Sequence, residues 1–246
     1  MNNSTITKYN NDGEIKISNL INKKEIYSVL KEYKKFTFQK NRQFGKDFNY
    51  LNNAKKLTSL HRLEKYKKSY FFKIANKKKI FSTAKKLLGK NCKLYSIQFF
   101  FKNMKHNLPT PPHQDNAYWC FKNGKGLSFW IALNKTSKLN GSLYYYKKTH
   151  NKDIRHVSSY GTPGSSQKIK MNKKIKKTYY KLNAGDSVAH DSRIIHGSFK
   201  NQEKKDRKAF IISFVTKDSK KDSVKIKNYN KRLSEISIRN KKKLFN

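Results

Sequence analysis

Residues 94–101 read LYSIQFFF, and the character of the chain changes at this run. Aromatic residues favour β-strands, so the run predicts a strand. A second apolar run, LSFWIAL at 127–133, has the same character, and the turn dipeptide Asn140-Gly141 leads into a third at 142–146. Further strands are predicted at 178–182, 187–190 and 208–216. Many short strands between turn signals are typical of a closed or double-sheet β structure such as a jelly roll.

The N-terminal segment predicts a mixture of short elements. Residues 1–12 are polar, and we expect them to be frayed. Residues 14–18 alternate in polarity and predict a short strand. Asn22 followed by Glu25 has the pattern of a helix N-terminus, with apolar residues at helical spacing behind it. Residues 37–66 are polar and predict no definite element.

A second helical region is predicted at 70–89. Lys77 interrupts its apolar stripe, which indicates two shorter helices, and Gly89 is placed to end the region. The segment after Asp218 is basic, and its apolar residues have the spacing of an amphipathic helix: Val224, Ile226, Leu233, Ile236 and Ile238. We therefore divide the chain into N-terminal elements at 1–91, a β core at 92–217 and a basic C-terminal tail at 218–246, within one domain overall.

The net charge is extreme, because 58 lysines and arginines face 15 acidic residues and leave +43. Such a charge attracts nucleic acid and anionic surfaces. The lysines are scattered along the whole chain, however, and accompany many asparagines and isoleucines, as expected for an A/T-rich genome. We interpret the charge as compositional drift with a solvated surface rather than as a dedicated nucleic-acid footprint.

The cysteines and the N-terminus bear on the compartment. Cys92 and Cys120 form no Cys-x-x-Cys pair and do not suggest a disulfide framework. Residues 1–5 lack a basic region followed by an apolar run, and no apolar run is long enough to span a bilayer. A reducing compartment, the cytoplasm by default, is therefore the expectation.

The triplet His113-Gln114-Asp115 carries the first candidate chemistry. On an extended strand, residues two apart project to the same side. An imidazole nitrogen and a carboxylate oxygen are two of the three donors in the 2-His-1-carboxylate site of non-heme Fe(II) oxygenases. His190 and His196 compete as the third donor, and composition does not choose between them. The other histidines lie in polar or loop-like contexts and are expected to be surface or hydrogen-bonded residues: His61, His106, His150 and His156.

Arg207 has two interpretations. The last predicted strand begins directly after it, so its guanidinium could point into a barrel mouth and bind a carboxylate with two hydrogen bonds. It also belongs to the charge run 204–208, and such runs are usually solvated turns. Charge context alone favours the solvated turn.

Several short motifs follow one another along the chain: HQDNAYW (113–119), WIALN (130–134), NGSL (140–143), Gly185-Asp186 through His190, His196-Gly197-Ser198, Asn201 and Arg207. Taken together, they resemble the phytanoyl-CoA dioxygenase (PhyH-like) family of Fe(II)- and 2-oxoglutarate-dependent oxygenases. The resemblance covers about residues 92–216 and rests on the order and joint spacing of these motifs. The family often has a Pro-Gly-Ser-His turn after the third of these, where this chain has Lys147-Lys148-Thr149-His150.

The resemblance implies a fold and a set of ligands. The fold is α+β, with a double-stranded β-helix (jelly-roll or cupin-like) core, N-terminal helices packed outside it and a C-terminal basic helical tail. The implied metal ligands are His113, Asp115 and His196, with His190 as a neighbour. Arg207 matches the cosubstrate arginine, because it follows His196 by 11 positions, and Ser198 matches a second 2-oxoglutarate contact. The resemblance thus reverses the interpretation of Arg207 from solvated to functional.

The implied activity is a dioxygenase that uses Fe(II), 2-oxoglutarate and O2 to hydroxylate an unactivated C–H bond, with release of succinate and CO2. The substrate class is a small molecule or an acyl or amino-acid derivative. Halogenating relatives lack the carboxylate ligand, so Asp115 favours hydroxylation. Four residues could line the substrate or cosubstrate pocket, although ordinary core packing suits the aromatic ones equally well: Gln98, Tyr118, Trp119 and Trp130.

Other functions remain open from sequence alone. A non-catalytic basic module that binds nucleic acid on a β-barrel scaffold explains the charge, but it leaves the ordered histidine, aspartate and arginine set as coincidence. A nucleic-acid-modifying dioxygenase uses a similar ligand pattern but resembles this chain less around the ligands. A family member without turnover is disfavoured because all the implied ligands are present.

Overall fold

The computed structural model describes residues 2–40, 48–50, 57–103, 108–159, 165–171 and 175–242. Within the helices and strands, the side chains of 38–40, 48–50 and 236–242 are not described. His106 and the side chains of Ile236 and Ile238 therefore lie outside the described residues. So do residues 41–47 and 51–56, which belong to the stretch 37–66 for which no element was predicted.

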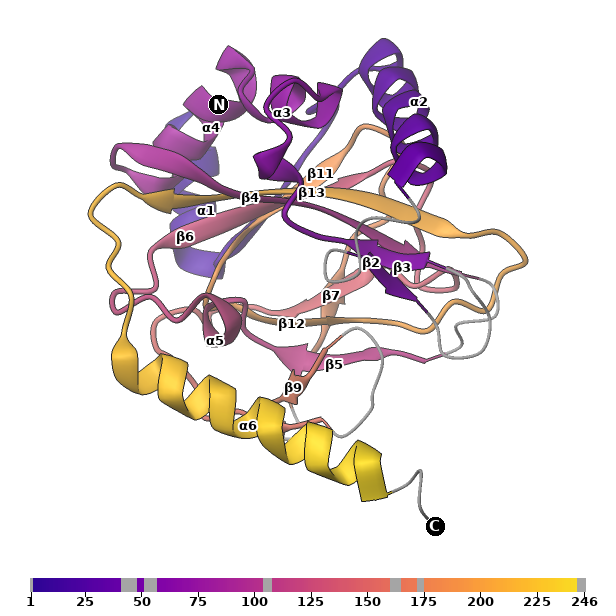
Figure 1. Cartoon of the computed structure of the whole chain (residues 1–246). Coiled ribbons are helices and arrows are strands. Elements are labelled where there is room, and N and C mark those ends of the chain that lie inside the picture. Colours follow the sequence, from indigo (N-terminus) through magenta and orange to yellow (C-terminus); the bar gives the residue numbers. More distant parts are fainter. Residues whose placement is uncertain are drawn as a thin grey trace.

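Two antiparallel sheets form the centre of the molecule (Figure 1). The larger sheet has the strand order β1 (Glu14–Ile17), β11 (Ser187–Asp191), β6 (Gly126–Ala132), β13 (Arg207–Thr216), β4 (Cys92–Lys102), β3 (Leu57–Leu60) and β2 (Phe48–Tyr50). The smaller sheet has the order β10 (Thr178–Tyr179), β7 (Leu143–Tyr146), β12 (Ile195–Ser198) and β5 (Thr110–His113). The short strands β8 (Val157–Ser158) and β9 (Gln167–Lys168) pair with each other.

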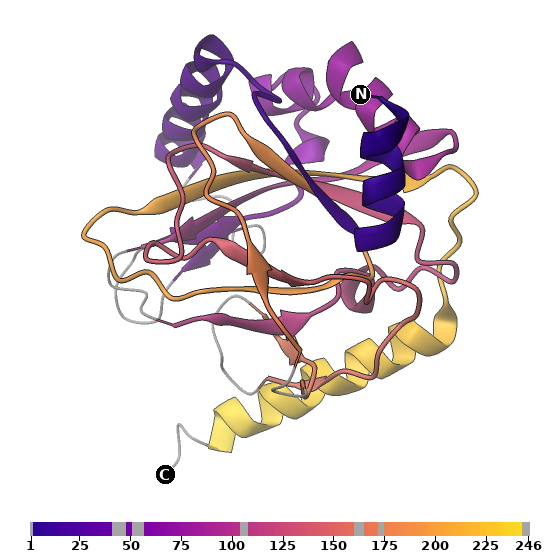
Figure 2. The same cartoon turned by 180° about the vertical axis from the view of Figure 1, so that it is seen from behind.

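Helices cover the outer face of the larger sheet. They are α2 (Lys23–Lys40), α3 (Tyr70–Ala75) and α4 (Lys78–Leu88), with the short 3-10 helix η1 (Leu63–Lys65) beside β4. Figures 1 and 2 show α2, α3 and α4 on one side of this sheet and the smaller sheet on the other. The molecule is therefore layered as helices, large sheet and small sheet.

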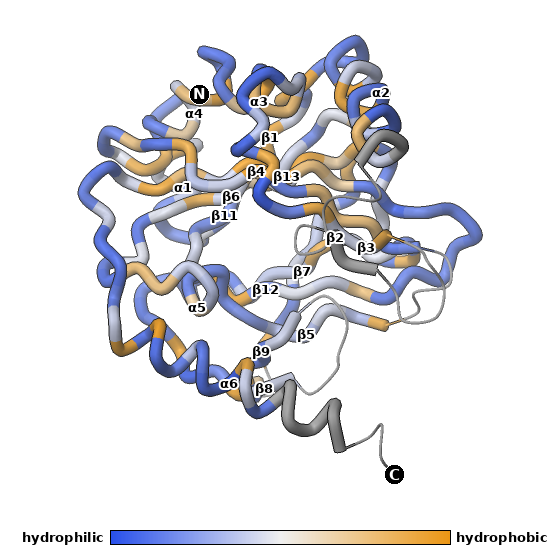
Figure 3. Tube along the Cα trace, viewed as in Figure 1, coloured by the Kyte–Doolittle hydropathy of each residue, from blue (hydrophilic) through white to orange (hydrophobic). Residues whose placement is uncertain are grey.

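Alternation along the strands separates two cores. On β4 and β13, Phe99 and Phe210 face the helices and contact Phe71. Ala209 and Ile211 point the other way, toward the small sheet, where they pack with Trp130. Figure 3 shows the apolar residues concentrated where β4 and β13 run beneath the helices. Because side chains alternate between faces with a period of two, the strands of the large sheet are apolar on both sides.

The predicted frayed N-terminus is wrong, because residues Asn3–Asp12 form helix α1. The Asn2 side chain accepts a hydrogen bond from the Thr5 amide (3.1 Å) and caps the helix start, while Gly13 ends the helix in a left-handed conformation (φ 80°). Buried Tyr9 and an ion pair between Asp12 and Lys147 (2.8 Å) attach the helix to the domain. The polar composition of residues 1–12 gave no indication of these tertiary contacts.

The helix start predicted at Asn22 and Glu25 is confirmed as a reciprocal capping box. The Glu25 amide donates to Asn22 Oδ1 (3.0 Å), and the Asn22 amide donates to Glu25 Oε2 (2.8 Å). The region 70–89 does divide into two helices, α3 and α4, and Gly89 ends the second with a φ of 63°. These local signals were strong enough to predict the elements from sequence.

The N-terminal segment also contributes strands: the strand predicted at 14–18 is confirmed as β1, whereas β3 lies in the stretch 37–66, for which no element was predicted. β1 pairs with β11 at one edge of the large sheet, and β3 pairs with β4 toward the other. The segment after Asp218 forms α6 (Ser223–Lys242), which lies beyond the small sheet (Figure 2). Lys225 and Arg232 bind Asp153 (2.7 Å) and Gln167 (2.5 Å), so α6 is docked on the domain. Among the described residues, none of the helices has the length and apolar character needed to cross a membrane.

Candidate metal centre

Two neighbouring strands of the small sheet bring two histidines together. His113 is the last residue of β5, and His196 lies on β12 directly opposite it in the strand register. Their ring centroids are 4.4 Å apart, and both side chains are buried. His196 therefore joins His113 from the adjacent strand of the same sheet.

Asp115 reaches the same place by a route that differs from the prediction. The strand ends at His113, and Asp115 has a helical conformation (φ −59°, ψ −36°) as the cap of α5 (Asn116–Trp119). The expectation that both residues project from one face of an extended strand is therefore wrong. The chain instead turns into a helix after His113, and this turn directs the carboxylate back to the histidines.

The donor atoms of these three residues converge. Nε2 of His113 and Nε2 of His196 lie 4.0 Å and 3.7 Å from Oδ1 of Asp115, and the three candidate ligand atoms lie within 4.8 Å of one another. Each Nδ1 faces a backbone carbonyl, at Pro111 (2.9 Å) and Ile194 (3.1 Å). A carbonyl only accepts, so each Nδ1 carries the proton and each Nε2 presents a lone pair toward Asp115.

The protonation states suit a metal ion. Burial lowers the pKa of His113, and burial together with neighbouring His113 lowers the pKa of His196 to about 3, so both imidazoles are neutral at neutral pH. Burial alone would raise the pKa of Asp115, but the hydrogen bond from His190 and the nearby imidazoles hold it well below its usual value. Two neutral imidazoles and one carboxylate form the donor set of open non-heme iron sites.

His190, the competing third donor, contacts the far side of the carboxylate. Its Nε2 lies 3.3 Å from Oδ2 of Asp115, and the Ser128 hydroxyl donates to the same oxygen at 3.0 Å. Oδ2 is thus held by protein groups, while Oδ1 faces the two histidines. His190 fits the description of a neighbour that orients the ligand.

Arg207 lies inside the protein. Only 4% of it is exposed, and its guanidinium carbon lies 5.1 Å from the centroid of the Trp130 ring. Its Nη1 makes one long hydrogen bond to the Phe100 carbonyl (3.5 Å), and its Nε has no hydrogen-bond partner among the described residues. The interpretation of Arg207 as a solvated turn residue is therefore wrong. A buried guanidinium with free donors is suited to bind an anion.

Lys102 is a second buried basic residue, and it was not among the predicted site residues. It pairs with Arg207 in the β4–β13 register, and its Nζ donates to the Ser198 hydroxyl (2.7 Å) and to the carbonyls of Phe199 (2.6 Å) and Leu108 (3.1 Å). Burial, with Arg207 nearby, lowers its pKa to about 6, and burial lowers the pKa of Arg207 to about 9. In the described part of the chain, no ion pair joins either cation to a carboxylate. The signal available in the sequence was a single lysine at the end of an aromatic strand.

The predicted pocket residues fall into different surroundings. Trp130 packs against Arg207, and Gln98 lies on the inner face of β4 with Phe100 and Lys102. The Tyr118 ring meets His113 edge to face (5.8 Å). Trp119 packs away from the histidines, in a cluster with Phe121, Val215 and Tyr95.

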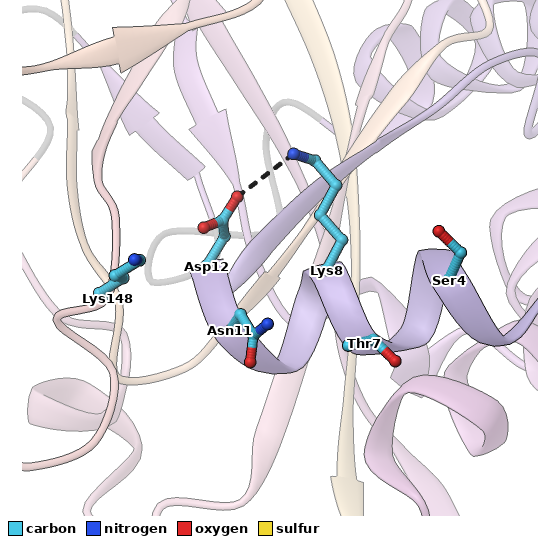
Figure 4. A pocket seen from close by; sticks show the side chains of 6 residues that line it. All are labelled: Ser4, Thr7, Lys8, Asn11, Asp12 and Lys148. Carbon is cyan, nitrogen blue, oxygen red and sulfur yellow. Dashed lines mark ion pairs between the residues drawn. The ribbon is translucent and has the colours of Figure 1, made fainter.

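The other described histidines have hydrogen-bond partners of their own. His61 contacts Ser59 (2.8 Å), His150 contacts the Asn10 carbonyl (3.0 Å), and buried His156 accepts from the Gln114 amide (3.0 Å). A surface pocket formed by α1 and Lys148 is also distinct from the cluster, because none of the predicted site residues lines it (Figure 4).

The largely buried cluster of His113, Asp115 and His196 could therefore hold a metal ion, and its donor set is that of open non-heme iron sites. The family model described as phytanoyl-CoA dioxygenase (PhyH) matches residues 9–209. The protein belongs to this family. The match begins within α1 and extends to the start of β13, so it includes all three residues of the cluster and Arg207.

Solved structures share the fold at low sequence identity. The α-ketoglutarate-dependent epimerase SnoN from nogalamycin biosynthesis is 17% identical, with a TM-score of 0.69 over 87% of this chain and 81% of that chain. EctD from S. alaskensis, solved with 2-oxoglutarate and 5-hydroxyectoine, is 13% identical, with a TM-score of 0.72 over 88% and 76%. EvdO2 from Micromonospora carbonacea var. aurantiaca, solved with 2-oxoglutarate, is 18% identical, with a TM-score of 0.71 over 91% and 94%. No curated protein matches the sequence significantly.

Proposed function

We propose that this protein is an Fe(II)- and 2-oxoglutarate-dependent dioxygenase that hydroxylates an unactivated C–H bond of a small molecule or of an acyl or amino-acid derivative. One observation carries the proposal. His196 of the metal-binding cluster lies two residues from Ser198 on β12, and the Ser198 hydroxyl accepts a hydrogen bond from buried Lys102. A metal-binding group and a carboxylate-binding group side by side suit a cosubstrate that has one end for each.

Three residues would hold the iron. His113 and His196 each offer a neutral Nε2, and Asp115 offers Oδ1. When bound, iron with 2-oxoglutarate and O2 supplies the oxidising power for the reaction, with release of succinate and CO2. Because Asp115 keeps the third protein position as a carboxylate, the donor set favours hydroxylation over halogenation.

Arg207 and Lys102 would hold the distal carboxylate of 2-oxoglutarate, with Ser198 between them and the metal ligands. A carboxylate would supply the acceptor that the Arg207 Nε lacks. It would also favour the charged form of Lys102, which burial and the neighbouring Arg207 disfavour. The apolar inner residues around Arg207, such as Trp130 and Ile211, exclude water from this end of the site.

The proposal extends to the fold and its division. We propose that the two sheets form a double-stranded β-helix and that residues 92–217 are the catalytic core. The N-terminal residues 1–91 would complete the edges of the large sheet and its helical cover. Residues 218–246 would form a basic C-terminal element docked on the core. The structures of EctD and EvdO2 with 2-oxoglutarate and of SnoN with Fe3+ and α-ketoglutarate support the cofactor assignment.

The solved structures that share the fold include enzymes named for different reactions. Two structural neighbours are an epimerase and a carbocyclase, and a third was solved with a hydroxylated compound, 5-hydroxyectoine. A non-catalytic nucleic-acid-binding module would leave both the metal-binding cluster and the buried cations without a role, so we do not propose it.

Anaerobic addition of Fe(II) and then 2-oxoglutarate to the purified protein tests the proposal. We expect a visible charge-transfer absorption that needs both additions, and succinate formation on exposure to O2 that increases with a true substrate. Screening small molecules and acyl or amino-acid derivatives by succinate release would then identify the substrate class. Absence of both the absorption band and succinate would refute the proposed function.

Lys102 makes 2-oxoglutarate binding pH-dependent. In the free protein its pKa is about 6, so the amine is mostly neutral at pH 7.5. A bound carboxylate favours the charged form and raises this pKa, so binding takes up a proton between pH 6 and the raised value. We therefore expect 2-oxoglutarate affinity to fall as the pH rises through this window.

Calorimetry in buffers of different ionisation enthalpy measures the proton uptake at pH 7.5. The Lys102→Met variant should bind 2-oxoglutarate more weakly and take up no proton. A wild-type protein that binds 2-oxoglutarate without proton uptake would contradict the assignment of Lys102 to the carboxylate.

A further inference from the structure

A row of polar residues crosses the inner face of the large sheet. The strand register places Glu14 opposite His190, His190 opposite Ser128, Ser128 opposite Ser213, and Ser213 opposite Ser96. Partners across neighbouring strands share one face of a sheet. The first four residues are almost completely buried, with exposed fractions of 0%, 2%, 1% and 1% in this order. Buried polar groups in an apolar sheet need hydrogen-bond partners, so their contacts indicate their purpose.

The middle of the row meets the metal-binding cluster at one atom. Ser128 and His190 both contact Oδ2 of Asp115, at 3.0 Å and 3.3 Å. Behind them, the Ser213 hydroxyl lies 2.9 Å from the Ser128 hydroxyl, and the Tyr145 hydroxyl lies 3.3 Å from Nδ1 of His190. Two short chains of hydrogen bonds therefore end on the oxygen of Asp115 that faces away from His113 and His196.

Proton counting fixes the direction of both chains. The ionised carboxylate only accepts hydrogen bonds, so Ser128 donates its single hydroxyl proton to Oδ2. The Ser213 hydroxyl must therefore donate to the Ser128 hydroxyl. Likewise, His190 donates its Nε2 proton to Oδ2, which leaves Nδ1 to accept from Tyr145. Each outer hydroxyl orients an inner donor, and each inner donor holds the same carboxylate oxygen.

We propose that Ser128 and His190, aligned by Ser213 and Tyr145, are positioning residues that keep Asp115 a single-oxygen ligand; this inference rests on the proposed function. His113, His196 and Oδ1 of Asp115 would hold the iron and leave positions open for the cosubstrate and O2. If Oδ2 also turned to the iron, one of these open positions would be lost.

The experiment measures Fe(II) affinity by anaerobic titration against a competing chelator, on the full chain. Outer groups that orient metal ligands typically change metal affinity by about 10- to 100-fold when removed. We expect a loss in this range for Ser128→Ala and a smaller loss for Ser213→Ala. Because Ser213 acts through Ser128, the double variant should bind Fe(II) no more weakly than Ser128→Ala alone.

Ser96→Ala is the matched control. Ser96 continues the row on β4, but its buried hydroxyl has no hydrogen-bond partner in the described part of the chain, so the same substitution there should leave Fe(II) affinity unchanged. Tyr145→Phe removes only the hydroxyl behind His190 and tests the second chain, with a loss of a few-fold expected. It also keeps the inference testable if Ser128→Ala does not fold, as judged from thermal unfolding without metal.

The outcomes separate the inference from the proposed function. Wild-type affinity in both Ser128→Ala and Tyr145→Phe, or an equal loss in Ser96→Ala, would overturn the positioning role while the proposed function stands. Additive losses in the Ser128 and Ser213 double variant would overturn the relay between these two serines. A wild-type protein that binds no Fe(II) would overturn the proposed function, and this inference with it.

Discussion

Replacing His196 with alanine should abolish tight Fe(II) binding. The substitution removes one of three donor atoms that lie within 4.8 Å of one another. Removing an outer residue that merely orients a ligand weakens metal binding by about 10- to 100-fold, so the loss of a ligand itself should exceed about 100-fold. Anaerobic titration with Fe(II) measures the affinity directly, and the charge-transfer band with 2-oxoglutarate should disappear in parallel.

Two other histidines provide the comparison for this variant. His150→Ala removes an imidazole that contacts only the Asn10 carbonyl among its described hydrogen bonds, and it should bind Fe(II) like the wild type. His190→Ala should lie between the two, because His190 holds Asp115 without belonging to the cluster. If His190→Ala abolished binding while His196→Ala retained it, the assignment of the third ligand would be reversed.

Replacing Arg207 with alanine should remove most of the affinity for 2-oxoglutarate while leaving Fe(II) affinity near the wild-type value. Truncating one partner of a buried, hydrogen-bonded charge pair costs about 2 to 5 kcal/mol. That range corresponds to about a 30-fold to several-thousand-fold rise in Kd. The effect should be selective, because Arg207 packs on Trp130 and contacts none of the three proposed metal ligands in its described hydrogen bonds.

Lys204→Ala is the matched control for charge, because it removes an exposed cation from the same run of the sequence. It should bind 2-oxoglutarate like the wild type. Arg207→Lys should recover only part of the lost affinity, since an ammonium group lacks the planar pair of donors that matches a carboxylate. If removing Lys204 weakened binding as much as removing Arg207, a diffuse positive field rather than a built site would explain the affinity. Calorimetric titration of the Fe(II)-loaded variants distinguishes these cases.

Several features of this protein could be predicted from its sequence because they depend on nearby residues. The reciprocal cap at Asn22 and Glu25 needs only a spacing of three. The strand at 94–101 needs only its aromatic run, and it appears within β4. The family resemblance rests on the order of short motifs, and the match over residues 9–209 confirms it. It also corrected the interpretation of Arg207 that charge context had favoured.

Other features depend on which strands pair and in which register, and short stretches of sequence do not contain that information. The position of Asp115 is the clearest case: the alternation rule placed it on a strand, but the chain turns into α5 and aims its carboxylate at the cluster. Lys102 is one of many lysines in the sequence, and only the β4–β13 register shows that it is buried beside Arg207. The same holds for α1, whose polar sequence predicted fraying although tertiary contacts fold it.

The sequence by itself therefore determined the residue types, the local elements and the family, because these follow from propensity, capping and motif spacing. Only the tertiary structure decided that His196 stands opposite His113, that Lys102 and Arg207 are buried side by side, and that a polar row meets Asp115. The physical reason is that strand pairing joins residues far apart in the chain. A shift of one residue in any of these pairings would turn the side chains to the opposite face and dismantle the site.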